Sequence, residues 1–286
     1  MAVSVKRITT FAEGLDHPEC VAVHPDGSVW AGGEDGQIYR VAADGSRLDE
    51  VARMKGGFIL GIAFSPDARW LLACDLRNHC VWRIDTKSGQ ATTFATGAGK
   101  HRFAIPNSAV FTRSGDVFVS ESGGFNACIG KILKFDQNGK GIVWHDGPLH
   151  FANGLALNAD ESVLYVAATG LPGVETIGVG PDGSAGRRSI LRKMPKTVPD
   201  GLAFDAKGNL YVACYAPAAI YRIASNKSMS VVAYDWTAHA LSAPTNVAFG
   251  GPNFDQLYTA NLSRWHITRI DLRIKGMPLA CHHPRS

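Results

Sequence analysis

The sequence predicts an all-β fold, a six-bladed β-propeller with four antiparallel strands in each blade. Three observations support this prediction. A short apolar phrase occurs six times at intervals of 41 to 47 residues, which is the period expected of propeller blades. Each copy opens a series of short strands with period-two alternation, separated by Gly or Asp turns. No segment shows a sustained helical period.

The repeats follow one plan along the chain. The recurring phrases are PECVAV, ILGIAF, PNSAVF, ANGLAL, PDGLAF and PTNVAF. In the fifth repeat the phrase and the strands that follow are expected at residues 202–204, 210–213 and 220–223. A fourth strand closes most repeats, as at residues 91–95, 142–145 and 230–234. Four strands in each of six units make a six-bladed propeller.

The two ends of the chain are predicted to share the last blade. The sixth repeat has no evident fourth strand, whereas the chain begins with a spare one at residues 5–11. The segment TTFAEG that ends this spare strand resembles TTFATG in the fourth strand of the second repeat. We therefore expect the N-terminal strand to close the last blade, which removes an exposed edge. Residues 1–286 are then expected to form a single domain.

The composition limits which classes of binding partner are expected. The formal charge is only +4, from 29 basic and 25 acidic residues, and the one basic cluster, at residues 187–196, has no interleaved aromatics. We expect a small-molecule substrate and no nucleic acid. Neither a secretion signal nor an apolar run of 18 residues is present, so we expect no membrane partner and a cytoplasmic location. These features leave the oligomeric state open.

One position of the recurring phrase carries oxygen donors in four of the six repeats. The residues at this position, in chain order, are Glu19, Leu60, Asn107, Asn153, Asp200 and Thr245. The innermost strand of a propeller blade runs along the central channel, so these residues should gather at one mouth. Two carboxylates and two amides form an all-oxygen set with a charge of minus two. The sequence therefore predicts a site for one divalent cation, calcium first and magnesium or manganese next.

A local interpretation competes with the metal site for two of these donors. Asn153-Gly154 and Asp200-Gly201 are also dipeptides that commonly shape turns. Turn chemistry would explain these two positions but neither Glu19 nor Asn107.

Further polar residues are predicted at the same mouth. The second strand of each blade ends there, which places Asp75, Glu121 and Asn261 in a second ring. We expect Asp75 and Glu121 to contact the substrate or support the metal, with solvated loop carboxylates as the alternative. His150 lies just ahead of Asn153, where it would either relay protons or be incidental.

The chain resembles the regucalcin (senescence marker protein) and gluconolactonase family of six-bladed propellers. The segments that carry the resemblance are PNSAVF, FANGLAL, VPDGLAFDAKGNLYVA and PTNVAFGGPNFDQLYTANLSRWHITRIDL. The resemblance implies a divalent metal, often calcium, held by a Glu, two Asn and an Asp. The matching positions here are Glu19, Asn107, Asn153 and Asp200. It also implies lactone hydrolysis with Asp200 as the general base.

The chain departs from this family at the predicted substrate pocket. Ile105 stands where sugar-lactone members often have an Arg, and Ser108 replaces an acidic residue. Apolar side chains are expected near the same mouth, namely Phe58, Leu60, Phe103, Phe125, Phe151 and Tyr215. These features count against a sugar acid lactone.

The leading functional hypothesis is a metal-dependent lactonase, a carboxylic ester hydrolase acting at the channel mouth. The metal would stabilise the oxyanion while Asp200 deprotonates the attacking water. Two alternatives remain open. One is a metal-binding propeller without catalysis, and the other is a non-hydrolytic propeller lyase or isomerase with an apolar substrate.

Overall fold

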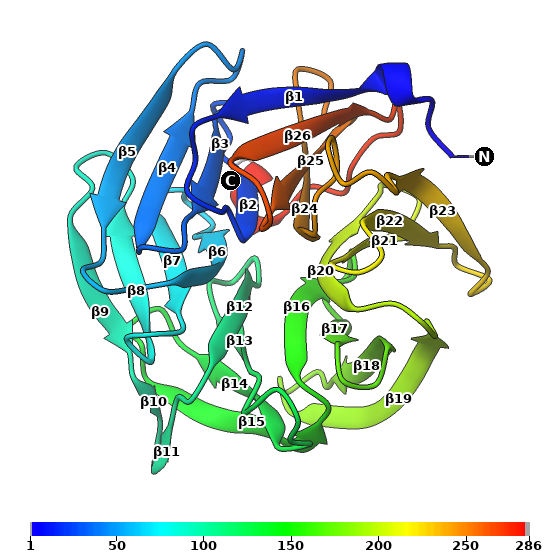
Figure 1. Cartoon of the computed structure of the whole chain (residues 1–286). Coiled ribbons are helices and arrows are strands. Elements are labelled where there is room, and N and C mark those ends of the chain that lie inside the picture. The colour runs from blue at the N-terminus through cyan, green and yellow to red at the C-terminus, as the bar shows by residue number, and fades with distance from the viewer. Residues whose placement is uncertain (1, 284–286) are drawn as a thin grey trace.

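The computed structural model describes residues 2–283 and contains six four-stranded antiparallel sheets arranged around a central axis (Figure 1). The six-bladed propeller predicted from the sequence is confirmed. Within residues 2–283 the helices are two three-residue 3-10 turns, η1 (Val5–Arg7) and η2 (Ala280–His282). Neither turn is long and apolar enough to cross a bilayer.

In each of the first three blades, the strands follow the chain order from the innermost strand outward. Blade 1 contains β2 (Cys20–Val23), β3 (Val29–Gly32), β4 (Gln37–Val41) and β5 (Leu48–Arg53). Blade 2 contains β6 (Ile59–Phe64), β7 (Trp70–Asp75), β8 (Cys80–Asp85) and β9 (Ala91–Ala95). Blade 3 contains β12 (Pro106–Phe111), β13 (Val117–Glu121), β14 (Gly130–Phe135) and β15 (Gly141–Leu149).

The last three blades repeat this order. Blade 4 contains β16 (Ala152–Leu157), β17 (Val163–Ala168), β18 (Gly173–Val179) and β19 (Ala185–Lys193). Blade 5 contains β20 (Pro199–Phe204), β21 (Leu210–Cys214), β22 (Ala219–Ile223) and β23 (Met229–Tyr234). Blade 6 contains β24 (Pro244–Gly250), β25 (Gln256–Asn261), β26 (His266–Asp271) and β1 (Ile8–Glu13).

Blade 6 joins the two ends of the propeller, as predicted. Strand β1 pairs antiparallel with β26, from Ile8 opposite Ile270 to Glu13 opposite His266, and forms the outer strand of the blade (Figure 1). The strand begins three residues later than the predicted range of 5–11 because the residues before it form η1. The pairing covers the edge that β26 would otherwise expose.

The hydrophobic core lies between neighbouring blades. One cluster, for example, joins Val110, Phe118 and Ile132 of blade 3 to Leu155 and Leu164 of blade 4. Period-two alternation supplies such side chains to both faces of each sheet, so each blade is covered by its two neighbours. This packing holds the inner strands in place around the axis.

Two features of the fold were not predicted. A small hairpin of β10 (Gly97–Ala98) and β11 (His101–Arg102) lies between blades 2 and 3. The segment before residue 283 returns to the axis beside β2 (Figure 1), and the Met277 N–H donates to the carbonyl of Phe204 over 2.9 Å. With the inner strands, this segment lines an apolar cavity of about 100 Å³ at the ends of those strands. It therefore covers the mouth opposite the predicted donors.

Candidate metal centre at the open mouth

The predicted donors lie at equivalent places in the inner strands. In blades 2 to 6 the pairing between the inner strand and its neighbour shifts by one residue at this place, as between Pro106 and Ala109 in β12. Such a bulge leaves one residue out of the ladder and redirects its side chain. Asn107, Asn153 and Asp200 fall within these shifts, and Glu19 immediately precedes β2.

The glycines after two donors allow neighbouring inner strands to approach closely. Asn153-Gly154 and Asp200-Gly201 lie inside β16 and β20, so the turn interpretation of these dipeptides is wrong. A Cβ atom on Gly154 would stand 2.3 Å from the carbonyl oxygen of Asp200. A Cβ atom on Gly201 would stand 2.5 Å from the Cα atom of Asn246 in the next blade. Any larger residue would force the strands that carry the donors apart.

Hydroxyl groups bind the backbones of the donor residues from neighbouring blades. The Thr245 hydroxyl donates to the carbonyl of Glu19 over 2.6 Å, and the Ser120 hydroxyl donates to the carbonyl of Asn153 over 2.8 Å. The Thr169 hydroxyl donates to the carbonyl of Pro199, just before Asp200, over 2.6 Å. These bonds join blade 6 to blade 1, blade 3 to blade 4 and blade 4 to blade 5. The donor backbones are therefore fixed relative to one another.

The four donor side chains are buried, and the two carboxylates among them interact. Glu19 and Asp200 are each 8% exposed, and Asn107 and Asn153 are each 5% exposed. Burial, followed by the negative charge of Asp200, raises the pKa of Glu19 well above its usual value. Burial also raises the pKa of Asp200, and a hydrogen bond from Asn153 partly opposes that shift. Two like charges thus lie together where water does not screen them.

The residues present fit a hard divalent cation. Oε2 of Glu19 is buried and has no hydrogen-bond partner among residues 2–283. The side-chain nitrogen of Asn153 donates to Thr169 over 3.2 Å, which leaves the amide oxygen as a ligand. Over the same residues, no group of three or more His, Cys, Asp and Glu side chains gathers to hold a metal. The candidate centre is not a cluster of this type, because two of its four oxygen donors are the amides of Asn107 and Asn153.

Asp75, predicted to contact the substrate, holds a loop instead. Its carboxylate is completely buried and accepts hydrogen bonds from the N–H groups of Phe58, Arg77 and Asn78, at 3.0 to 3.1 Å. It also accepts bonds from the side chains of Asn78 and Trp82, at 2.8 and 2.9 Å. Both oxygens are therefore occupied, and the side chain fixes the segment that enters the inner strand β6.

Glu121 and Asn261 play the same part in their own blades. The Glu121 carboxylate is 1% exposed and accepts the N–H groups of Ala104, Ile105 and Gly123, each at 2.9 Å. The Asn261 side-chain oxygen accepts the N–H of Ser242 at 2.9 Å. The second ring thus anchors the segments that lead into β6, β12 and β24.

The remaining two predicted residues lie at the mouth. His150 is half-buried, and its carbonyl accepts the N–H of Gly170 over 2.9 Å. The part of its side chain in proton transfer stays a prediction. Ile105 is also half-buried, two residues before Asn107, and its N–H is held by Glu121.

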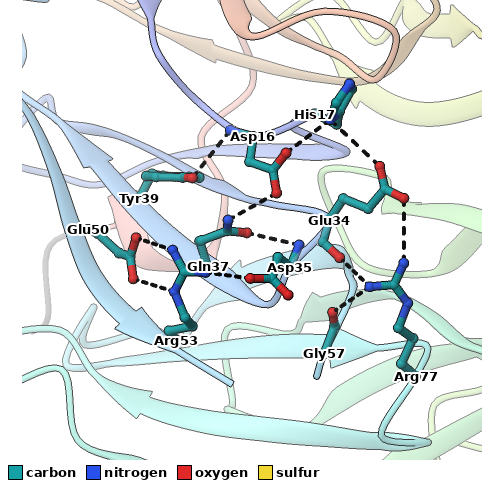
Figure 2. Close-up of polar contacts among 10 residues, drawn as sticks. All are labelled: Asp16, His17, Glu34, Asp35, Gln37, Tyr39, Glu50, Arg53, Gly57 and Arg77. Atoms are coloured by element: carbon teal, nitrogen blue, oxygen red, sulfur yellow. Dashed lines mark hydrogen bonds and ion pairs between the residues drawn. The ribbon is translucent and has the colours of Figure 1, made fainter. Parts of the chain in front are cut away.

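A polar network that sequence reasoning did not identify includes His17, two residues before Glu19 in the sequence (Figure 2). His17 Nδ1 is 2.9 Å from a carboxylate oxygen of Asp16 and 3.7 Å from one of Glu34. The Arg77 guanidinium donates to the carbonyl of Glu34 over 2.8 Å and lies 3.5 Å from its carboxylate. The negative charge of Glu34 also raises the pKa of Glu19. These charges are paired with one another within the network.

Fold and site together define a class, a six-bladed propeller with a buried set of oxygen donors at one end of its channel. Residues 78–262, nearly two thirds of the chain, match the SMP-30/Gluconolactonase/LRE-like region. The chain belongs to that family, as the sequence resemblance implied. A second, shorter match, at residues 5–41, is to the N-terminal part of strictosidine synthase-like proteins.

Individual relatives agree with this assignment. A gluconolactonase of Zymomonas mobilis is 28% identical over 180 residues, which are 56% of this chain and 50% of that protein. The chain thus matches about half the length of this curated relative. The structure of a gluconolactonase from Xanthomonas campestris has a TM-score of 0.79 at 18% identity, covering 93% of this chain and 89% of that one. A calcium-binding protein, regucalcin, from Agrobacterium tumefaciens has a TM-score of 0.76 at 16% identity, covering 96% and 97%. At these identities the two structures support the fold alone.

Proposed function

We propose that the protein is a divalent-metal-dependent hydrolase that opens a lactone, or a related cyclic ester, at the donor mouth. The cation, calcium by preference, is held by Glu19, Asn107, Asn153 and Asp200. Family membership supports lactone hydrolysis, and the gluconolactonase relatives point to the same reaction. The choice of calcium rests on the all-oxygen donor set, of which half are amides.

The observation that carries the proposal is the buried carboxylate pair. Glu19 and Asp200 are both less than a tenth exposed, and one oxygen of Glu19 has no partner among residues 2–283. Burying two like charges without compensation is costly, by several kcal/mol per ion. A divalent cation between them, with two amide oxygens beside it, removes this cost.

Asp200 acts as the general base in the proposed reaction. Its carboxylate takes a proton from a water molecule as the water oxygen attacks the lactone carbonyl. The ring C–O bond then breaks, the alkoxide receives that proton, and the product is a hydroxy acid. When bound, the cation would supply charge stabilisation for the developing oxyanion.

Lactone hydrolysis by Asp200→Asn tests this assignment. Because the amide cannot accept the proton, kcat should fall by about 10²-fold or more. The matched control is Asp182→Asn, an exposed turn residue at the opposite mouth, which should keep full activity. Thermal melts establish that both variants are folded. Unchanged kcat in folded Asp200→Asn would contradict the assignment.

A second candidate is a non-hydrolytic propeller lyase or isomerase. The strictosidine synthase-like match favours it, because this match covers residues 5–41 and includes Glu19. Product analysis separates the two candidates, since hydrolysis adds one water to the substrate and an isomerase or lyase adds none. A protein that binds calcium but turns over no substrate would instead be a metal-binding propeller without catalysis.

A further inference from the structure

A second layer of residues forms a rim directly above the donor ring. In blades 2 to 6 the residue two places before the donor position accepts, at its carbonyl, the N–H of the first residue after the second strand. These bonds measure 2.9 to 3.3 Å and repeat from blade to blade. We call these positions the rim. Its members are Phe58, Ile105, Phe151, Val198 and Ala243, and the equivalent position in blade 1 is His17.

The rim is apolar in five of its six positions, and exposed aromatic rings extend it. Phe125, from the loop between β13 and β14, is 73% exposed and stacks on Phe151 with ring centroids 4.6 Å apart and an interplanar angle of 21°. Tyr215, 41% exposed, is bonded through its N–H to the rim residue Val198. Trp265, 55% exposed, lies against His17 with ring centroids 5.5 Å apart. Large exposed rings around a candidate site indicate a surface that a ligand covers.

The second-ring side chains and Arg77 at this mouth are already paired. Asp75, Glu121 and Asn261 use their oxygens to hold backbone N–H groups. Arg77 is bonded to the carbonyl of Glu34, and its guanidinium carbon lies 5.3 Å from the centroid of the Phe58 ring. A polyhydroxylated ring needs several free donors and acceptors to replace its bonds with water. In place of such free donors and acceptors, the rim offers an apolar surface.

From this arrangement we infer that the natural substrate carries an apolar group, an alkyl chain or an aromatic ring, rather than several hydroxyl groups. The lactone carbonyl meets the donor ring, and the apolar group lies on the stacked pair Phe151 and Phe125. This inference rests on the proposed function and adds the class of substrate to it. Burial of the apolar group against the two rings supplies binding energy that a sugar lactone would not gain.

Two lactones of equal ring size test the inference. δ-Decalactone carries a pentyl chain, and D-glucono-1,5-lactone carries hydroxyl groups on the same six-membered ring. After subtraction of spontaneous hydrolysis, kcat/KM should be at least about tenfold higher for δ-decalactone. Equal values, or a preference for the sugar lactone, would overturn the inference while leaving the proposed hydrolase in place.

A variant then locates the apolar contact. Phe125→Ala should lower the ratio of kcat/KM for δ-decalactone to that for unsubstituted δ-valerolactone by about tenfold, mainly through KM. The control is Ile142→Ala, another highly exposed apolar residue (60%) on the outer strand β15, which should leave the ratio unchanged. An unchanged ratio in Phe125→Ala would contradict the placement.

Binding gives a readout that does not depend on turnover. The lactam 6-pentylpiperidin-2-one has the shape of δ-decalactone and resists hydrolysis, so calorimetry can measure its affinity for the calcium-loaded protein. We expect it to bind, and Phe125→Ala to weaken it about tenfold. If no lactone is opened, the proposed function fails, yet lactam binding that depends on Phe125 still supports the apolar rim. Absence of binding, or binding indifferent to Phe125, would overturn it.

Discussion

At the scale of single residues, the molecule buries two carboxyl groups, Glu19 and Asp200, where burial disfavours the charged form of each. Most buried acids in this protein are fully bonded, as Asp75 shows with five donors. Glu19 instead leaves one oxygen without a partner among residues 2–283 and lies in the field of Asp200. An arrangement that weakens the free protein and suits a bound ion is expected of a binding site rather than of a structural one.

This contrast predicts opposite effects of Glu19→Gln with and without the cation. In chelator the variant should melt higher than the wild-type protein, because one buried charge and one repulsion are removed. With calcium at about 100 times the Kd, the wild-type protein should gain about 3 kcal/mol, and the variant far less. Thermal melts in EDTA and in calcium measure both effects.

Glu13→Gln is the matched control, because Glu13 is an exposed residue of β1. It should follow the wild-type protein in both conditions. A Glu19→Gln variant that is less stable in chelator and gains as much from calcium would contradict the metal site.

Sequence reasoning at this scale predicted four buried polar residues at equivalent places in the inner strands, but it misjudged their neighbours. Their equivalent placement could be predicted because a fixed position in a repeated phrase corresponds to a fixed place in each inner strand. Asp75 and Glu121 also lie at a fixed place, the end of the second strand. Whether their oxygens are free depends on which N–H groups the adjoining loops bring to them. Alternation carries no information about loops.

At the scale of elements, the irregularity of the inner strands sets where the candidate donors lie. The strands themselves could be predicted from period-two alternation. The one-residue shifts at Asn107, Asn153 and Asp200 could not, because one extra residue does not disturb the apolar pattern that follows it. A signal was present in the Gly after two of these donors, which the structure explains by the close approach of neighbouring strands.

The closing strand leads to a test of the ring itself. Deletion of residues 1–13 removes β1, exposes the edge of β26 and takes Phe11 away from Tyr258, whose ring centroid lies 4.8 Å from its own. Loss of a buried aromatic alone costs about 3 to 5 kcal/mol. We expect the melting temperature to fall by about 10 °C. Thr9→Ala, at an exposed position of the same strand, should change it little, whereas an unchanged midpoint in the deletion would refute the closure.

At the scale of the whole molecule, the two mouths of the propeller differ. The C-terminal segment covers one mouth, and the candidate donors lie at the other. The number of blades could be predicted because the repeat period is even and the chain supplies a spare strand. The covering of the opposite mouth could not, since residues 272–283 have neither the phrase nor its alternation. There the segment contributes Leu279 and Cys281 to the lining of the channel cavity. The other mouth carries both the candidate donors and the apolar rim.

We propose that side-chain oxygens from blades 1, 3, 4 and 5 hold a divalent cation on the axis. Calorimetric titration of calcium into chelator-treated protein measures this binding. We expect one calcium ion per chain for the wild-type protein, and an affinity reduced at least about 100-fold in Asp200→Asn and in Glu19→Gln. Folded wild-type protein that binds no calcium, or variants that bind calcium as tightly as the wild-type protein, would refute the metal centre.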